Sequence, residues 1–199
     1  MIGLVKKLLG KEEKDPYWDY FLNRPLADPK NLVLDVITES PGGGVFHQKM
    51  DVHDPKAVAG HVVQLTQFFG ADLVGIIATD PGLIKYEGAS LPPPEELVSV
   101  YPYTVVSLAH WEYDAEKNPG MGGQLGRQKV AAAHFHLRSW IREVGFEAVF
   151  AYPASMKIYE AAGLGTVGSN GRLRTKEYGD KVAVETLVLT NLTMVPTAQ

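Results

Sequence analysis

The feature that most restricts the fold of this chain is a unit of helix, glycine and strand that occurs twice. The first copy is VVQLTQFFGADLVGIIA, residues 62–78, and the second is LRSWIREVGFEAVFAYP, residues 137–153. In each copy, apolar residues recur at helical spacing, a glycine ends the helix at Gly70 or Gly145, and a short apolar run suited to a buried strand follows. The pattern predicts an α/β or α+β protein with a mixed central sheet flanked by helices.

Further elements extend this plan. Asp54 is suited to cap a helix whose first position is Pro55, so the first of the two helices is expected to begin there. A central strand is predicted at residues 103–110, YTVVSLAH, and a closing strand within residues 181–192, KVAVETLVLTNL. The connection 79–100 is long and carries a short helical stretch, PEELVSV. Connections of this length often have a function.

The N-terminal part is expected to be an irregular extension, residues 1–53, packed on a body of residues 54–199. Within it, NLVLDVITE (31–39) and VFHQKMDV (45–52) are predicted as two strands that pair as a hairpin or at an edge. The segment MIGLVKKLLGKEEK, residues 1–14, is too short and too charged to span a bilayer. The cytoplasm is therefore the expected compartment.

Composition excludes several classes of function. The 199 residues have a net charge of −4, and their lysines and arginines do not cluster, which argues against nucleic acid or an anionic membrane as a partner. The chain has no cysteine, which excludes disulfides, zinc thiolate sites, thiol nucleophiles and iron–sulfur ligation. No G-x-S-x-G, P-loop or H-E-x-x-H motif is present.

A glycine-rich stretch, YEAAGLGTVGSNGRLRTKEYG (159–179), has the G-x-G-x-x-G spacing of a dinucleotide-binding fingerprint at Gly163, Gly165 and Gly168. That fingerprint requires a strand before the first glycine and a helix after the last. Here a helical pattern precedes Gly163, and turn residues follow Gly168. The sequence therefore argues against a Rossmann site. It leaves open whether the glycines form turns alone or approach another ligand.

Four segments together resemble the corrinoid-binding domain of reductive dehalogenases, which is related to epoxyqueuosine reductases and to the nitroreductase-like fold of the human cobalamin-processing protein. They are FFGADLVGIIATDP, WIREVGFEAV, AAGLGTVGSNGRLRTKEYGDKV and LVLTNLTMVP, in that order. The third segment is the most specific. The resemblance implies a nitroreductase-like three-layer fold and a cobalamin or related corrinoid, held base-off near the glycine-rich turn.

The resemblance also implies which residues contact the cofactor. The cleft would be formed by the glycine-rich turn, the end of the strand at Tyr103 and the 79–100 connection. His110 is a conceivable cobalt ligand, although the family binds corrinoid without a protein imidazole. Glycines would let the backbone approach a flat macrocycle, but a helix cap followed by tight turns explains them equally well. The turn residues concerned are Gly163, Leu164, Gly165, Gly168, Ser169, Asn170 and Gly171.

Two departures from the family pattern bear on catalysis. Reductive dehalogenases follow this domain with a cysteine-rich segment that holds two iron–sulfur clusters, whereas this chain stops at Gln199 without a cysteine. Either the chain is a fragment, or it is a stand-alone domain that receives electrons from a ferredoxin or a flavoprotein. Where the family commonly has a tyrosine, near a helix start, this chain has Arg127 and Lys129. These two are the catalytic candidates, as groups that stabilise an anion, and the alternative is that they are solvated residues.

The histidines do not predict a metal site. His134 and His136 lie two positions apart on a predicted helix and so point in nearly opposite directions, unlike a chelating pair. His134 falls on the apolar face and is expected to be a hydrogen-bonded core residue.

The sequence therefore predicts a corrinoid-binding, reductive-dehalogenase-like protein, a candidate cobalt-dependent oxidoreductase in which the protein binds and orients the cofactor. Two alternatives stay open. One is a non-catalytic corrinoid carrier, and the other is a relic of the fold that binds flavin, or no ligand, and acts through protein contacts. The substrate and the oligomeric state do not follow from the sequence.

Overall fold

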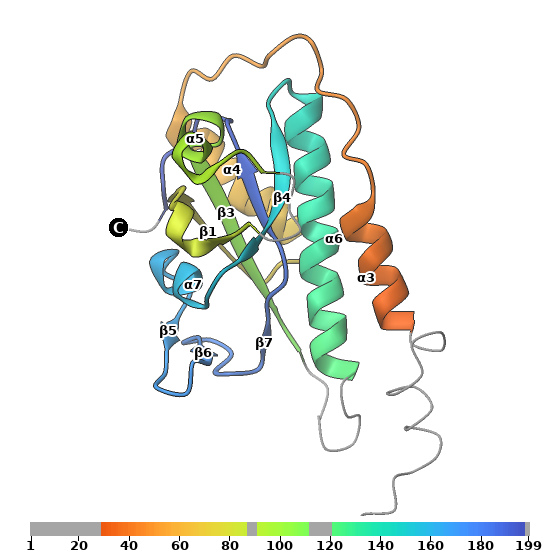
Figure 1. Ribbon diagram of the computed structural model, residues 1–199, viewed down its shortest axis with the longest axis vertical. Coiled ribbons are helices and arrows are strands. Elements are labelled where there is room, and N and C mark those ends of the chain that lie inside the picture. The colour runs from red at the N-terminus through yellow and green to blue at the C-terminus, as the bar shows by residue number, and fades with distance from the viewer. Residues whose placement is uncertain (1–28, 87–90, 112–120, 198–199) are drawn as a thin grey trace, which may run out of the picture.

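The computed structural model describes residues 29–86, 91–111 and 121–197 of the chain. At its centre is a sheet with the strand order β1-β3-β8-β4-β2, and a short strand, β7, continues the pairing of β3 (Figure 1). The strands of this sheet are β1 (Leu73–Ala78), β2 (Ile84–Lys85), β3 (Tyr103–His110), β4 (Ala148–Pro153), β7 (Val182–Ala183) and β8 (Leu187–Thr190).

Helices cover both faces of the sheet and give three layers, as expected. Helices α4 (Pro55–Phe68) and α6 (Met121–Glu143) pack on one face, and α5 (Pro94–Val100) and α7 (Lys157–Ala161) pack on the other. Side chains alternate along each strand, so Val105 lies in the core under α4 and α6 while Val106 lies in the opposite core. The predicted class of helices packed on a sheet is confirmed. The nitroreductase relationship stays a prediction.

The sheet is antiparallel at every described pairing, where a mixed sheet was predicted. The physical reason is the position of β8. Strands β3 and β4 both run antiparallel to β8, so they run parallel to each other, but β8 lies between them and they never pair. The strands of the repeated unit are β1 and β4, and they run in opposite directions, because β1 is antiparallel to β3 and β3 runs in the direction of β4. The local helix–glycine–strand pattern does not show this strand order.

The two copies of the repeated unit are built as predicted. Oδ1 of Asp54 accepts hydrogen bonds from the backbone N–H groups of Lys56 (2.9 Å) and Ala57 (3.2 Å) at the start of α4. The helices end at glycines with positive φ, +115° at Gly70 and +89° at Gly145. A Cβ at position 145 would also lie 2.5 Å from the carbonyl oxygen of Gln48, so the residue must be glycine for two independent reasons.

The strand pair predicted in residues 31–52 is wrong. The first run forms helix α3 (Pro29–Glu39), which packs against α6, and the second forms no strand. The β-branched residues of the first run favour a strand by propensity, but Leu34 and Ile37 lie one turn apart and pack inward, so tertiary contacts override propensity. The second run is held by the end of the α6 segment, where N–H groups of Phe46 and Met50 donate to carbonyls of Arg142 and Val144. The boundary at residue 53 stays a prediction.

Among the described residues, no helix is long and apolar enough to cross a membrane, and no three or more metal-ligating side chains form a group that could hold a metal ion.

Candidate functional site

The glycine-rich stretch forms a helix cap followed by a small hairpin. Gly163, with φ +71°, ends α7, and its N–H donates to the carbonyl of Glu160 at 2.9 Å. Strand β5 (Thr166–Val167) then pairs with β6 (Leu173–Arg174). In the described residues after Gly168, turns and short strands follow and no helix begins, as the turn residues predicted.

Two glycines of this hairpin are explained by the chain itself. A Cβ at position 165 would lie 2.5 Å from the carbonyl oxygen of Arg174 on the opposite strand, and Gly171 has φ +74°, which favours glycine in the turn. A Cβ at position 168 would lie 3.0 Å from Oδ1 of Asn170, a tight contact that the Asn170 side chain can relieve by moving. The absence of side chains at positions 165 and 171 is therefore explained without a ligand. Contact between these glycines and a corrinoid stays a prediction.

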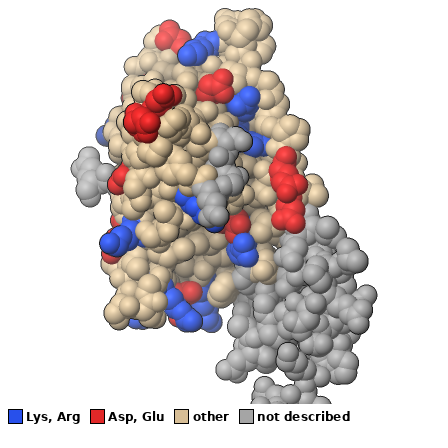
Figure 2. Space-filling model, viewed as in Figure 1, with Lys and Arg blue, Asp and Glu red and all other residues tan. Residues whose placement is uncertain are grey.

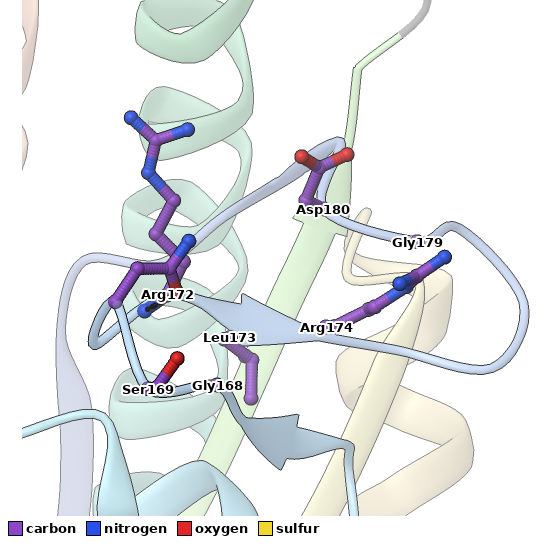
Figure 3. Close-up of a pocket in the computed structure, with 8 residues that line it drawn as sticks. Gly168, Ser169, Arg172, Leu173, Arg174, Gly179 and Asp180 are labelled. Carbon is purple, nitrogen blue, oxygen red and sulfur yellow. Dashed lines mark hydrogen bonds between the residues drawn. The ribbon is translucent and has the colours of Figure 1, made fainter.

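A hollow of about 430 Å³ opens beside the hairpin turn. Arg172 and Arg174 are two positions apart on an extended segment and share its exposed side, while Leu173 between them is buried. Figure 3 shows Arg172 and Arg174 on opposite sides of the hollow, with the carboxylate of Asp180 between them. The lining residues are Gly168, Ser169, Asn170, Arg172, Leu173, Arg174, Gly179 and Asp180.

The charged side chains that line this hollow are not paired with each other or with other described residues. Neither arginine nor Asp180 forms an ion pair with another residue in the described part of the chain. Figure 2 shows Lys and Arg side chains beside Asp or Glu side chains at the lower end of this face, where Figure 1 places β5 and β6, and other cations higher on the same face. The hollow thus offers guanidinium, hydroxyl and amide donors together with one carboxylate acceptor.

His110 lies close to the end of the glycine-rich stretch. Its ring stacks on that of Tyr178, with centroids 4.5 Å apart and planes 7° apart. Its Nδ1 is 2.9 Å from Oδ2 of Asp72, and the same oxygen accepts the backbone N–H of His110 at 2.8 Å. The carboxylate and the tyrosine ring together fix the orientation of the imidazole. The structure thus places His110 beside the loop that borders the hollow.

Arg127 and Lys129 have different surroundings. Arg127 lies seven residues into α6 rather than at its start, and its Nε donates to Oε2 of Glu185. That hydrogen bond raises the pKa of Arg127 above its usual value. Lys129 is exposed and lies two positions further along the helix, so it points away from Arg127. Because neither residue is in the first turn, the helix dipole places no special demand on them.

Tyr103 lies far from the other candidates. It begins β3, whereas His110 ends that strand, and seven steps of about 3.3 Å separate them by roughly 23 Å. The described residues therefore bring His110 and the glycine-rich hairpin to one end of the sheet and leave Tyr103 at the other. Part of the 79–100 connection, residues 87–90, lies outside the described residues.

His134 is a core residue, as predicted. It is fully buried, and its ring nitrogens are hydrogen-bonded to the hydroxyls of Ser107 (2.7 Å) and Thr186 (2.9 Å). Burial lowers its pKa to about 3, so the ring is neutral and ties α6 to the sheet. His136 instead stacks on Phe69 at the surface, which confirms that the two histidines point apart.

Several residues of this end of the molecule were missed from the sequence. The alternation Arg172–Leu173–Arg174 is a signal for a short strand with two charges on one side, and it was read as part of a turn. Asp72 and Glu185 gave no comparable signal, because single carboxylates next to apolar runs are normally solvated. Their roles depend on contacts with residues distant in sequence.

Comparisons with known proteins agree with the resemblance found in the sequence. No family model matches the chain, and no curated protein matches it. Among solved structures, the catabolic reductive dehalogenase NpRdhA in complex with 3-bromo-4-hydroxybenzoic acid has a TM-score of 0.69 and 17% identity, over 85% of this chain and 24% of that one. A structure described as suggesting a mechanism for B12-dependent dehalogenation has a TM-score of 0.69 and 18% identity, with the same coverage.

A second group of enzymes shares the fold over a smaller region. Epoxyqueuosine reductase from Bacillus subtilis has a TM-score of 0.51 and 15% identity, over 71% of this chain and 47% of that one. The chain thus spans about a quarter of the length of the dehalogenases that it matches and about half that of the reductase. Over these regions, the chain has the fold found in B12-dependent reductive dehalogenases and in epoxyqueuosine reductase.

Proposed function

We propose that this chain is a corrinoid-binding domain that holds cobalamin, or a related corrinoid, at the hairpin end of the sheet. The observation that carries the proposal is the fold, which covers 85% of the chain in its match to a B12-dependent reductive dehalogenase. The hollow beside the hairpin supports the location, because it lies on the segment in which the sequence resemblance is most specific.

The residues that line the hollow fit the chemistry of a corrinoid periphery. That periphery carries amides, which both donate and accept hydrogen bonds, and a phosphodiester, which accepts them. Arg172, Arg174 and Ser169 supply donors, and Asp180 accepts from amide N–H groups. About 430 Å³ is near the lower end of ligand pockets, roughly 300–1,000 Å³. The hollow therefore suits the nucleotide tail or one edge of the macrocycle rather than the whole cofactor.

The protein's part in any reaction is to bind and orient. A bound corrinoid would supply a reducible cobalt centre, and an external ferredoxin or flavoprotein would supply electrons. Arg127, whose guanidinium is held by Glu185, is a further candidate to hold an anionic group at this end of the molecule, beside Arg172 and Arg174 in the hollow. His110 is held by Asp72 and Tyr178 and would border the ligand.

The first test is a titration of the protein with hydroxocobalamin and with reduced Co(II) cobalamin, followed by absorbance. We expect saturable binding with a base-off spectrum. Arg172→Ala/Arg174→Ala should bind about tenfold more weakly, because two charged donors are lost. The matched control is Lys56→Ala/Lys85→Ala, which removes the same charge from exposed positions outside the hollow. A folded wild-type protein that binds neither form would refute the proposal.

Glycine substitutions are unsuitable for this test. A side chain at position 165 would clash with the carbonyl of Arg174, so lost binding would report a broken hairpin instead of a lost contact. The arginine side chains are exposed, and their removal leaves the hairpin backbone unchanged.

A corrinoid carrier is the second candidate, because a cysteine-free chain has no thiolates to hold an iron–sulfur relay of its own. The two candidates differ in turnover. Cobalamin-loaded, chemically reduced protein would be supplied with 3-bromo-4-hydroxybenzoic acid, the compound bound by NpRdhA. Protein-dependent bromide release would support the enzyme, and tight binding without release would support the carrier.

A further inference from the structure

Glu185 is a charged residue in a largely buried position. It lies in the short link between β7 and β8, and only 10% of its side chain is exposed. Burying a carboxylate is costly unless it is paired and hydrogen-bonded. The Nε of Arg127 supplies both the charge and the hydrogen bond.

The backbone around this pair leaves it little freedom. Gly126 packs so closely against β7 that a Cβ there would lie 2.5 Å from the Cβ of Ala183. Helix α6 therefore packs closely on β7, the strand that leads to Glu185. Arg127 is the residue that follows Gly126 on the helix. The pair is set by the packing of two elements rather than by a chance meeting of long side chains.

The two partners differ in how far they reach solvent. The Arg127 side chain is 40% exposed, four times the fraction of Glu185. A guanidinium has five N–H donors, and the bond to Glu185 uses the single one on Nε. Within the described ranges, no residue accepts from the terminal nitrogens of Arg127. One edge of the guanidinium is thus anchored, and the other is available to a ligand.

The charge of Glu185 also acts on a buried hydroxyl that is not hydrogen-bonded to it. Tyr159 is fully buried, and its Oη makes no hydrogen bond to any described residue. Burial and the negative charge of Glu185 raise the pKa of Tyr159. Glu185 therefore acts on Tyr159 through space, while its hydrogen bond goes to Arg127.

The pair lies on the same end of the molecule as the hollow. Asp180, which lines the hollow, precedes Ala183 by three residues, a span of at most about 10 Å. Ala183 in turn contacts Gly126, the neighbour of Arg127. Figure 1 shows β5, β6 and β7 at the same lower end of the molecule as the beginning of α6, with β7 between β6 and the helix.

We infer that Glu185 is a positioning residue, which fixes Arg127 so that its free edge holds an anionic group of the ligand bound at the hollow. The inference rests on the proposed function, because that function supplies the ligand. It assigns the hairpin end three guanidinium groups, two exposed on β6 and its turn and one anchored on α6. It also gives the buried carboxylate a role that stability alone does not require.

The test is a double-mutant cycle on hydroxocobalamin affinity. Glu185→Gln keeps the size and an acceptor but removes the charge that orients Arg127. We expect it to weaken binding about tenfold, and Arg127→Ala to weaken it at least as much. In the Arg127→Ala background, Glu185→Gln should have no further effect. Lys56→Ala, which removes an exposed cation at the start of α4 outside the hollow, should leave the affinity unchanged.

The cycle separates positioning from a general structural role. If Glu185 served only the fold, Glu185→Gln would weaken binding equally in both backgrounds, and that result would overturn the inference. Wild-type affinity in a folded Glu185→Gln variant would overturn it too, while the proposed function would stand. If the folded wild-type protein binds no cobalamin, both fail together.

Discussion

At the scale of single residues, the molecule separates groups that hold the fold from groups that remain available. His134 has both ring nitrogens engaged by hydroxyls in a closed core. Arg172 and Arg174 have no charged partner in the described part of the chain and line a hollow. From residue type alone, a histidine and an arginine are both candidates for ligand binding. Their surroundings in the fold decide which of the two side chains a ligand can contact.

His134 gives the protein a specific pH dependence. Its pKa is about 3 in the folded protein against about 6.5 when exposed, so below pH 6.5 the unfolded chain takes up a proton that the folded chain refuses. The effect of His134 on the free energy of unfolding is constant above pH 6.5. As the pH falls from 6.5 toward 3, His134 lowers that free energy by about 1.4 kcal/mol per pH unit. Urea unfolding from pH 7 to pH 4 should show this slope, and His134→Gln should lack it. Equal slopes in the two proteins would contradict the assignment.

Three glycines are expected to respond to alanine with different signs. At position 165 a Cβ meets a carbonyl at 2.5 Å, so Gly165→Ala should cost about 1–3 kcal/mol. Gly171→Ala should cost about 1–2 kcal/mol because of its positive φ. Gly60 lies inside α4 with open space around it, and Gly60→Ala should stabilise by up to about 1 kcal/mol. Thermal unfolding measures all three, and a stabilising Gly165→Ala would show that the hairpin is not packed as described.

At the scale of elements, a buried cation on α6 is hydrogen-bonded to the residue that follows helix α3. Arg138 on α6 is 7% exposed, its guanidinium lies 3.9 Å from the ring centroid of Phe150, and its Nη2 donates to the carbonyl of Ser40 at 2.7 Å. Burial, and then the neighbouring charge of Arg142, lower its pKa. The cation is therefore stabilised by an aromatic face and a carbonyl in place of a carboxylate.

Arg138→Ala should loosen α3 and the segment that follows it. Loss of the cation–π contact and the carbonyl hydrogen bond is expected to cost about 2–3 kcal/mol, and protease cleavage within residues 29–46 should become faster. Val36→Ser, at a position 66% exposed, is the control and should not change the cleavage rate. Unchanged cleavage in Arg138→Ala would mean that α3 is held by its apolar contacts alone.

The elements that sequence predicted well are those with a long, regular pattern. Helices α4 and α6 and strands β1, β3 and β4 follow from periodicity, caps and terminal glycines. The strand predicted at residues 31–39 is wrong because packing against α6 outweighs the β-rich composition of the segment. The closing strand was predicted as continuous, but it breaks into β7 and β8 around Glu185, which leaves the sheet to meet Arg127. Such a break depends on a partner that is distant in sequence.

At the scale of the whole molecule, the antiparallel strand order and the hollow depend on the same part of the chain. Strand β8 lies between β3 and β4 in the sheet but is the last strand in sequence, after the β5–β6 hairpin and β7 at one end of the sheet. Local pattern therefore predicts the layers but neither the strand order nor the set of side chains gathered at that end. The resemblance to corrinoid-binding domains drew attention to that end of the molecule, because its most specific part is the glycine-rich segment that forms the hairpin.

Because β8 is buried on both faces, the two cores should unfold as one unit. Val188 packs in the core under α4 and α6, and Leu189 packs in the core on the opposite face. Leu189→Ala should cost about 2–5 kcal/mol and Val188→Ala somewhat less. In each variant, made in a Trp18→Phe/Trp111→Phe background so that the fluorescence comes from Trp140 on α6, fluorescence and far-ultraviolet circular dichroism should give one coincident urea transition at a lower midpoint. If the two signals separated in Leu189→Ala, the cores would be independently stable, and β8 would not couple the two layers.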